Sequence, residues 1–317
     1  MDLSVVVPTF NSRERLATCL DALDHHASGI ETIVVNGPST DGTTGMIHER
    51  DDVDVLVELA TRNINTARNV GLAEATGEVV CLLAPEYVVG ESWRTAIESA
   101  YDAGFDVVTG PTFPDRATEP SSQGPSTRTI AGRTVVPICG GNLAMTRRAL
   151  AALDGFDEYL ELGGARDLAH RIAGLELSVT RELQMGVRGG IQADGGQYEV
   201  AHRRHLPEPN GGSNRHWFLE YRSLTYRLVK NYGIRPYVVR RTVREAVSDA
   251  ISSARDVVGG SVGASSWIGN GTDVLQSIAL GTKDGICARR ADRSATRNPH
   301  GLSNANPRRV VECYDWR

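Results

Sequence analysis

Two short apolar runs near the start of the chain each end in residues that could bind a ligand. The first, Ser4–Val7, leads into Pro8-Thr9-Phe10-Asn11, and the second, Thr32–Val35, leads into Asn36-Gly37-Pro38 and Asp41. Between them, Ser12 can cap a helix with apolar residues at helical spacing, namely Leu16, Cys19, Leu20 and Leu23. Such a βαβ unit places both polar segments at the carboxyl edge of a parallel sheet, where ligands bind. A Gly-x-Gly-x-x-Gly motif does not follow the first run, which disfavours a dinucleotide-binding fold of the dehydrogenase type.

The elements that must position these segments alternate along the N-terminal half. Apolar runs bounded by turn residues predict strands near 3–8, 31–36, 53–58, 79–84 and 105–109, with helices near 13–25, 41–49, 64–75 and 91–102. Further strands are expected near 134–138 and 142–146, and helices near 147–153 and 166–173. Alternation of this kind is typical of an α/β fold with a mostly parallel sheet flanked by helices.

Four ordered blocks of this sequence resemble family 2 glycosyltransferases. They are Ser4–Asn11, Val34–Gly42, Ala67–Gly71 with Ala75–Glu78, and Gly140–Arg148 with Gly155–Glu158. The resemblance covers roughly residues 3–232 and implies a GT-A (Rossmann-like) fold. It also implies transfer of a sugar from a nucleotide diphosphate sugar, with inversion in a single displacement. Such a reaction needs a site for the nucleotide, neutralisation of the departing diphosphate and a general base.

For the nucleotide sugar, the resemblance points to Pro8, Thr9, Asn36 and Arg68. The family usually has Asp-Asp-Gly-Ser at the end of the second strand, where this chain has Asn36-Gly37-Pro38-Ser39. The Asn36 amide can still donate and accept a hydrogen bond, although it lacks the carboxylate. The alternative is that this segment only makes a turn and that Ser39 or Thr40 caps the next helix.

The divalent metal of the family is held by an Asp-x-Asp, and the corresponding residues here are Ala84-Pro85-Glu86. Only the second carboxylate is retained, so Glu86 is predicted to contact both the nucleotide sugar and the metal. Because Mg²⁺ keeps several waters, one carboxylate plus diphosphate oxygens could hold it, and Mn²⁺ would also suit. The resemblance implies His202 as a further ligand. The alternative is that Glu86 is a solvated loop residue in a protein without metal catalysis.

The acceptor side is predicted from the later blocks. Gly163–Arg171 resembles the family segment that carries the general base, and Asp167 is the predicted base, with Arg166 in place of the usual Glu. An Asp167–Arg171 ion pair on one helix is the alternative. The residues expected to bind the acceptor are Gly141, Asn142, Asp157 and Glu158. Arg222, Tyr226 and Lys230 share a helix face that either is solvated or binds phosphate.

The chain has 317 residues and a net charge of −5, but its charge is unevenly distributed. Residues 1–200 hold 15 basic against 29 acidic residues, whereas residues 201–317 hold 19 against 10. The basic segment 239–257 carries Val239, Val243, Val247 and Ala250 on one helical face, next to Arg240, Arg241 and Arg244. These helices are predicted either to lie on an anionic membrane surface or to pack against the catalytic domain or a second subunit.

The predicted organisation follows from these patterns. Residues 1–232 form the GT-A domain, with a nucleotide-sugar half (1–110) and an acceptor half (134–232). Residues 233–290 form an amphipathic helical extension, with a second helix near 272–288, and residues 291–317 a disordered tail. No stretch is apolar enough to span a membrane, no leader is recognisable, and the five cysteines form no Cys-x-x-Cys. A reduced cytoplasmic protein is therefore expected, with a place at the inner face of the membrane as the alternative to a freely diffusing one.

These observations predict a glycosyltransferase that uses a divalent metal and acts on a lipid-linked or glycan acceptor. Its expected partners are the nucleotide diphosphate sugar and that acceptor, with peripheral membrane contact and no nucleic acid. The rival is a binding or scaffold protein that keeps the fold and has lost the acidic motif at Ala84.

Overall fold

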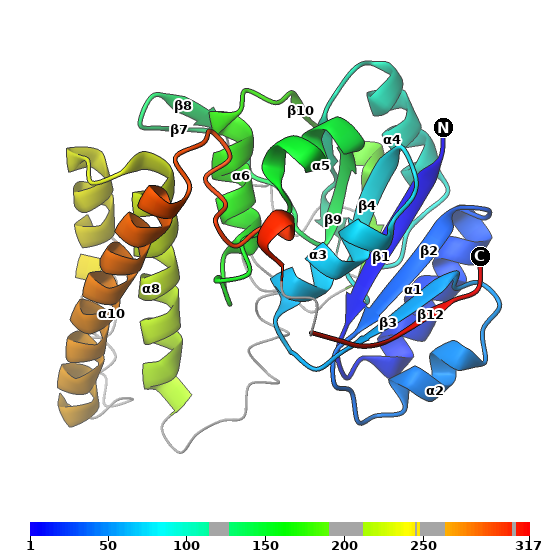
Figure 1. Ribbon diagram of the computed structural model, residues 1–317, viewed down its shortest axis with the longest axis horizontal. Coiled ribbons are helices and arrows are strands. Elements are labelled where there is room, and N and C mark those ends of the chain that lie inside the picture. Colours follow the sequence, from blue (N-terminus) through cyan, green and yellow to red (C-terminus); the bar gives the residue numbers. More distant parts are fainter. Residues whose placement is uncertain (114–126, 190–211, 245, 248–263, 306–308) are drawn as a thin grey trace.

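The computed structural model describes residues 1–113, 127–189, 212–244, 246–247, 264–305 and 309–317. Its centre is an eight-stranded sheet of order β10-β5-β9-β4-β1-β2-β3-β12 (Figure 1). The parallel strands β1 (Leu3–Thr9), β2 (Glu31–Asn36), β3 (Val55–Leu59) and β4 (Val79–Leu83) lie side by side in its middle. Near one edge, β5 (Val107–Thr109) pairs in parallel with β10 (Val179–Arg181), and β9 (Asn142–Thr146) runs antiparallel between β4 and β5.

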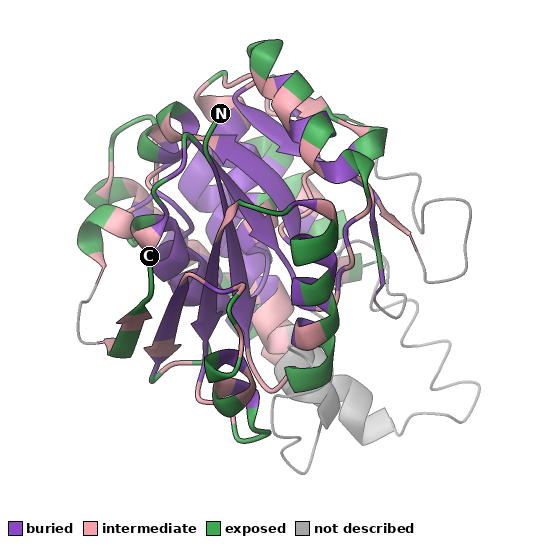
Figure 2. Cartoon of the chain, turned by 90° about the vertical axis from the view of Figure 1, so that its right-hand side faces the viewer, coloured by how far each residue is buried: buried purple, intermediate pink, exposed green. Residues whose placement is uncertain are grey.

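The strands are apolar on both sides because helices cover both faces of the sheet. In β1, Val5 and Val7 join one core cluster and Val6 joins the other. On the Val5 side lie α1 (Arg13–His26), α2 (Thr43–His48) and α4 (Ser92–Asp102). On the Val6 side lie α3 (Ile64–Glu74), α5 (Arg147–Leu153) and α6 (Gly164–Gly174). Figure 2 shows the central strands of the sheet buried between helices whose outer sides are exposed. The predicted mostly parallel α/β sheet flanked by helices is confirmed.

Small elements complete the rim of this sheet. A two-stranded pair joins β6 (Thr112–Phe113) to β11 (Val187–Arg188), which follows the 3-10 turn η1 (Leu183–Met185). A hairpin joins β7 (Arg128–Ile130) to β8 (Arg133–Val135). The hairpin contributes Ile130 and Val135 to a third core cluster under the C-terminal helices.

Two long helices, α8 (Gly212–Tyr232) and α10 (Ala264–Ala291), pack along each other beside α6 (Figure 1). Their approach is close because α10 presents glycines to α8. A Cβ on Gly281 would lie 2.2 Å from Thr225 Oγ1, and one on Gly285 would lie 2.8 Å from the Tyr226 carbonyl oxygen. Residues 236–244 and 246–247 are also helical. Within the described parts of the chain, no helix combines the length and apolar character that crossing a bilayer requires.

The prediction that residues 291–317 are disordered is wrong for the described residues of this tail. The segment includes η2 (Leu302–Asn304) and β12 (Val310–Asp315), which pairs antiparallel with β3 and closes that edge of the sheet. Its polar composition suggested disorder, but its polar groups are used in contacts. Asn298 is buried and donates from Nδ2 to the carbonyl oxygens of Asp154 (2.7 Å) and Gly155 (3.2 Å). The predicted boundary at residue 232 stays a prediction.

Candidate functional site

The loops that follow β1 and β2 are joined by a hydrogen-bonded network at the carboxyl edge of the sheet. The main-chain N–H of Asn11 donates to Ser39 Oγ (2.9 Å), and Ser39 Oγ donates to Asn36 Oδ1 (2.7 Å). Thr40 N donates back to Asn11 Oδ1 (2.8 Å), and Asn36 Nδ2 donates to Thr44 Oγ1 (3.0 Å). Both ends of the buried Asn36 amide are therefore engaged in the turn, which favours the turn alternative. The nucleotide contact of Asn36 stays a prediction that requires a change of partner.

Thr9 lies next to Asn36 in the register of β1 and β2, and Pro8 lies next to Val35. The Thr9 side chain is buried, and its hydroxyl has no hydrogen-bond partner in the structure. A buried hydroxyl without a partner costs about 1–3 kcal/mol, which a water or a ligand could recover. Thr9 thus remains a candidate for the nucleotide site, together with Pro8.

Arg68 reaches the site from α3. The residue is buried, its Nη1 donates to Asn65 Oδ1 (3.1 Å), and its guanidinium lies 4.8 Å from the centroid of the Phe156 ring. A Cβ on Gly140 would lie 3.1 Å from Arg68 Nη2, so the Gly140 backbone passes directly over the guanidinium. Arg68 also lowers the pKa of the Glu86 carboxyl, against the larger effect of burial. Arg68 therefore places positive charge near the residue that replaces the family's metal-binding carboxylates.

Glu86 lies just beyond β4, in a segment fixed by backbone contacts. Ala84 N donates to the Gly141 carbonyl oxygen (2.9 Å), and a Cβ on Gly141 would lie 2.7 Å from Ala84 Cβ. Although Glu86 as a residue is partly exposed, its Oε1 is out of contact with solvent and has no hydrogen-bond partner. Burial raises the pKa of this carboxyl, while a hydrogen bond from the main chain of Glu86 itself and then the charges of Arg15 and Arg68 act in the opposite direction. The contribution of Arg15, an exposed residue of α1, could not be recognised from the sequence motifs.

The described residues around Glu86 offer one side-chain oxygen that could contact a metal. An unpartnered, buried carboxylate oxygen is the kind of ligand that Mg²⁺ and Mn²⁺ prefer. Within the described residues, however, no three His, Cys, Asp or Glu side chains gather closely enough to hold a metal by themselves. Ala84 offers no ligand, and His202 lies outside the described residues. The structure therefore fits a metal that takes one protein oxygen here and its other ligands from bound diphosphate and water.

The predicted acceptor residues lie in structural contacts. Asn142 is fully buried, accepts from Trp93 Nε1 (3.0 Å) and donates to the Met185 carbonyl oxygen (2.7 Å). It thereby joins β9 to α4 and η1. Gly141 packs against Ala84. These contacts give Asn142 and Gly141 structural roles, and their contact with an acceptor stays a prediction.

Asp157 and Glu158 are also engaged. Asp157 is fully buried and accepts from Lys230 Nζ (2.6 Å) and Tyr226 Oη (2.8 Å). Glu158 accepts from Asn69 Nδ2 (2.8 Å) and pairs with Arg309 of the tail. Both carboxylates therefore connect separate parts of the fold, and their contact with an acceptor stays a prediction.

Asp167, the predicted general base, occupies the same buried charge cluster. Its Oδ2 accepts from Arg171 Nε (2.9 Å) and Lys230 Nζ (2.8 Å), and its Oδ1 accepts from Asn231 Nδ2 (2.8 Å). Although burial acts to raise its pKa, the ion pairs with Lys230 and Arg171 outweigh burial and lower that pKa to about 2. A fully buried carboxylate with such a low pKa is a poor base. The Asp167–Arg171 alternative is thus supported, although the pair is buried rather than exposed.

We expect Asp167→Asn to lower the free energy of unfolding by about 1–3 kcal/mol, because the buried Lys230 and Arg171 each lose a charged partner. Urea unfolding at neutral pH would measure the change. Asp102→Asn is the matched control, since Asp102 is exposed at the end of α4. Unchanged stability combined with lost activity would instead restore Asp167 as a catalytic residue.

The sequence did not reveal the role of Lys230. It predicted only that the helix face of Lys230 either is solvated or binds phosphate. Neither alternative describes it, because Lys230 and Tyr226 are fully buried. One signal was available: the neighbours Leu224, Leu228 and Val229 place Lys230 within an apolar stretch, where a lysine requires a buried acid as partner.

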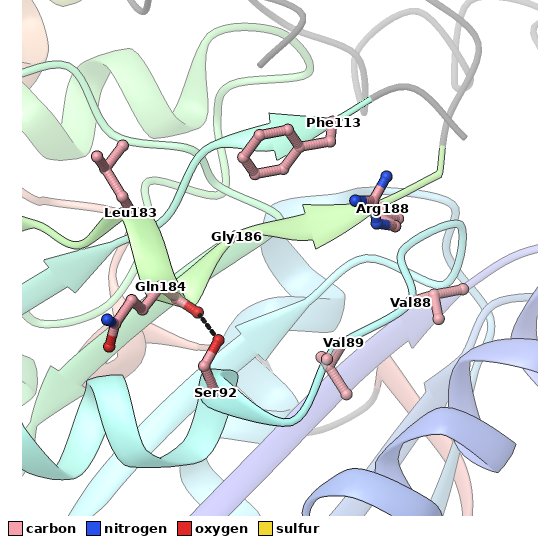
Figure 3. Close-up of a pocket in the computed structure, with 9 residues that line it drawn as sticks. Val88, Val89, Ser92, Phe113, Leu183, Gln184, Gly186 and Arg188 are labelled. Atoms are coloured by element: carbon pink, nitrogen blue, oxygen red, sulfur yellow. Dashed lines mark hydrogen bonds between the residues drawn. The ribbon is translucent and has the colours of Figure 1, made fainter. Parts of the chain in front are cut away.

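A separate pocket of about 240 Å³ opens beside this region (Figure 3). Its walls are the segment after β4 (Val88–Gly90), β11 and η1, with Phe113 from β6. Ser92 Oγ donates to the Gln184 carbonyl oxygen (2.8 Å), and the Arg188 guanidinium lies 5.8 Å from the Phe113 ring centroid. None of the residues predicted from the sequence lines this pocket, so we do not assign the donor to it.

Comparisons with known proteins agree with this geometry. Residues 4–152 match the family model described as glycosyl transferase family 2. A 116-residue stretch is 26% identical to glycosyltransferase AglE of Haloferax volcanii, and the match spans 34% of this chain and only 38% of AglE.

Solved structures show the fold. The mannosyltransferase PcManGT from Pyrobaculum calidifontis, in complex with GDP-Man and Mn²⁺, has a TM-score of 0.52 at 18% identity, over 92% of this chain and 88% of its own. TarS 1–349 of S. aureus has a TM-score of 0.53 at 15% identity, over 88% of this chain and 90% of its own. Glucosyl-3-phosphoglycerate synthase from Mycobacterium tuberculosis, in complex with Mn²⁺, UDP and glucosyl-3-phosphoglycerate, has a TM-score of 0.51 at 16% identity. The match covers 74% of this chain and 81% of the synthase. The predicted GT-A-type fold is thereby confirmed.

Proposed function

We propose that this chain, which contains a glycosyl transferase family 2 domain at residues 4–152, transfers a sugar from a nucleotide diphosphate sugar to an acceptor. One observation carries the proposal. The buried, unpartnered Oε1 of Glu86 lies at the carboxyl end of β4, in the electrostatic range of Arg68 and Arg15. A buried carboxylate oxygen without a hydrogen-bond partner is costly by itself, and it would be useful in a site that binds a metal diphosphate.

Different residues would serve different parts of such a reaction. Thr9, Pro8 and Asn36 lie where the nucleotide would bind, at the edge of β1 and β2. Arg68 would stabilise negative charge on the leaving diphosphate. A bound Mg²⁺ or Mn²⁺, held by Glu86 and by His202 if that residue reaches the site, would neutralise the diphosphate as a Lewis acid.

The transfer itself is proposed as a single displacement with inversion, as the family resemblance implies. The acceptor oxygen forms a bond to the anomeric carbon while the bond to the diphosphate oxygen breaks, and the acceptor proton passes to a base. Asp167 does not fit that base, because its oxygens are held by Lys230, Arg171 and Asn231. A lipid-linked or glycan acceptor is the proposed substrate class. GDP-Man, found with one protein of similar fold, and UDP sugars, suggested by the UDP found with another, are the first donors to test.

A non-catalytic binding protein is the second candidate. Ala84 replaces one acid of the family motif, and burial raises the pKa of the Glu86 carboxyl. Such a protein would bind the nucleotide sugar without turning it over.

We expect a GDP or UDP sugar to stabilise the protein in a thermal-shift screen, and Mn²⁺ to increase the effect. A ligand that binds only the folded state at 100 times its dissociation constant adds about 2.7 kcal/mol. Mn²⁺ alone and ADP serve as controls. Binding with release of nucleotide when candidate acceptors are added supports the transferase, and binding without turnover supports the binding protein. If no nucleotide shifts the transition with or without Mn²⁺, both candidates fail.

A further inference from the structure

The helical residues 236–244 and 246–247 have one packed side and one bare side. Val238 and Thr242 are buried at 3% and 5% exposure. On the other side, Val239, Val243 and Val247 are 51%, 54% and 51% exposed, and Ile234 just before the helix is 61% exposed. The alternative that the valine stripe packs on the catalytic domain is therefore wrong for these three valines. Ala250 lies outside the described residues.

Basic side chains surround this bare side. Arg235, Arg240 and Arg244 are exposed, and none forms an ion pair with an acidic residue in the described parts of the chain. Arg240 and Arg244 follow Val239 and Val243 directly in sequence, so apolar and basic side chains alternate on one exposed surface. We call Ile234, Arg235, Tyr237, Val239, Arg240, Val243, Arg244 and Val247 the bare face.

A second group of arginines extends the positive charge beyond this helix. Arg289 near the end of α10 donates to the carbonyl oxygens of Lys230 (2.9 Å) and Asn231 (3.1 Å), just before the turn that leads to Arg235. Burial, and then the charges of Arg297, Arg235 and Arg133, lower its pKa. These charge effects mean that four arginines from different elements, Arg289 and the three just named, lie close enough to repel one another. An anionic surface would relieve that repulsion.

We propose that the bare face and its neighbouring arginines bind the surface of bilayers that contain anionic lipid. The valines and Ile234 would enter the boundary between headgroups and acyl chains, Tyr237 would lie at the headgroups, and the arginines would contact lipid phosphates. We choose an anionic bilayer as the partner because its charge complements that of the bare face. Exposed apolar residues interleaved with unpaired cations suit an anionic interface better than a neutral protein surface. The inference goes beyond the proposed function and does not rest on it.

Sedimentation of the full chain with vesicles of phosphatidylcholine, with and without phosphatidylglycerol, tests the proposal in the absence of any sugar donor. We expect binding only to the anionic vesicles, and a marked loss of binding at high salt because exposed charges are screened within about 8 Å at physiological ionic strength. Each basic residue near an anionic leaflet contributes about fivefold to the partition coefficient. The double variant Arg240→Glu/Arg244→Glu should therefore bind at least about 25-fold more weakly, and Val239→Ser/Val243→Ser should also weaken binding.

Two controls match these variants. Arg181→Glu reverses an exposed arginine on β10, and Leu275→Ser removes an exposed apolar side chain (70%) on α10. Both should bind as the unmodified chain does, and circular dichroism checks that every variant is folded. The proposal is overturned if the chain ignores anionic vesicles at low salt or if Arg181→Glu is as defective as the bare-face variants. It is also overturned if the chain forms a dimer that the valine substitutions abolish, because the bare face would then be a protein interface.

Discussion

Replacing Lys230 with methionine is expected to lower the free energy of unfolding by about 3–5 kcal/mol, the cost of breaking a buried ion pair from one side. Lys230 Nζ lies 2.6 Å from Asp157 Oδ2 and 2.8 Å from Asp167 Oδ2, and all three side chains are fully buried. Without the ammonium, two carboxylates would face each other in a region that excludes water. Equilibrium unfolding in urea at neutral pH would measure the loss.

The chain supplies its own control, because Lys283 is its only other lysine and is exposed on α10. Lys283→Met should change stability by less than about 0.5 kcal/mol. The double variant Lys230→Met/Asp157→Asn should recover part of the loss, since it removes one of the stranded charges. Equal effects of the two lysine substitutions would contradict the buried cluster.

The same cluster predicts how stability depends on acid. The pKa of Asp167 in the folded protein is lowered to about 2, below its ordinary value of 3.8. Its ion pairs therefore stabilise the fold above the ordinary value, and that contribution is lost as pH falls from about 4 through 2. Lys230→Met should flatten this part of the stability curve.

The second large effect is expected at Glu86, where Glu86→Gln should reduce transfer about 10²–10³-fold and remove the added stabilisation by Mn²⁺ in the presence of donor. Among the described residues, Glu86 is the one carboxylate that fits the metal and diphosphate, and the substitution puts a neutral amide in its place. Removing a single electrostatic contact to a developing charge typically lowers the rate by this factor. Steady-state transfer assays and thermal shifts with donor, with and without Mn²⁺, would measure it.

Without donor and metal, Glu86→Gln should not weaken the protein. Because Glu86 Oε1 is buried without a partner, Glu86→Gln should leave the empty protein as stable as before or more stable. The raised pKa of Glu86 means that the folded state holds its proton more tightly, so the unmodified chain should lose stability relative to Glu86→Gln as pH rises above about 4.5. Glu78→Gln is the matched control, at an exposed position just before the other end of β4. Unchanged turnover and metal dependence in Glu86→Gln would remove Glu86 from the site.

Local sequence patterns sufficed for the sheet and for the edge at which its polar loops meet. The β-branched runs at Val5–Val7 and Ile33–Val35 could only be buried strands, and the polar residues after them had to meet at one edge because parallel strands all point the same way. The resemblance of ordered blocks added the expected GT-A fold and the likeness to family 2 glycosyltransferases. Glu86, Arg68 and Thr9 could be proposed for the site on that basis, since each lies within or directly after an element with a clear pattern.

What the sequence could not provide was the pairing of charges far apart in the chain. Asp157, Asp167 and Lys230 each look like solvated residues or reactive groups when considered alone, and only the packing of α8 beside α6 converts them into a buried cluster. The tail was misread for the same reason: β12 has little core of its own and becomes ordered because β3 offers an open edge. For the valine stripe at 239–247, helical periodicity determined which residues share a face, but tertiary packing decided that this face points outward. Periodicity is a local property of the backbone, whereas burial and charge pairing depend on which distant segments the folded chain brings together.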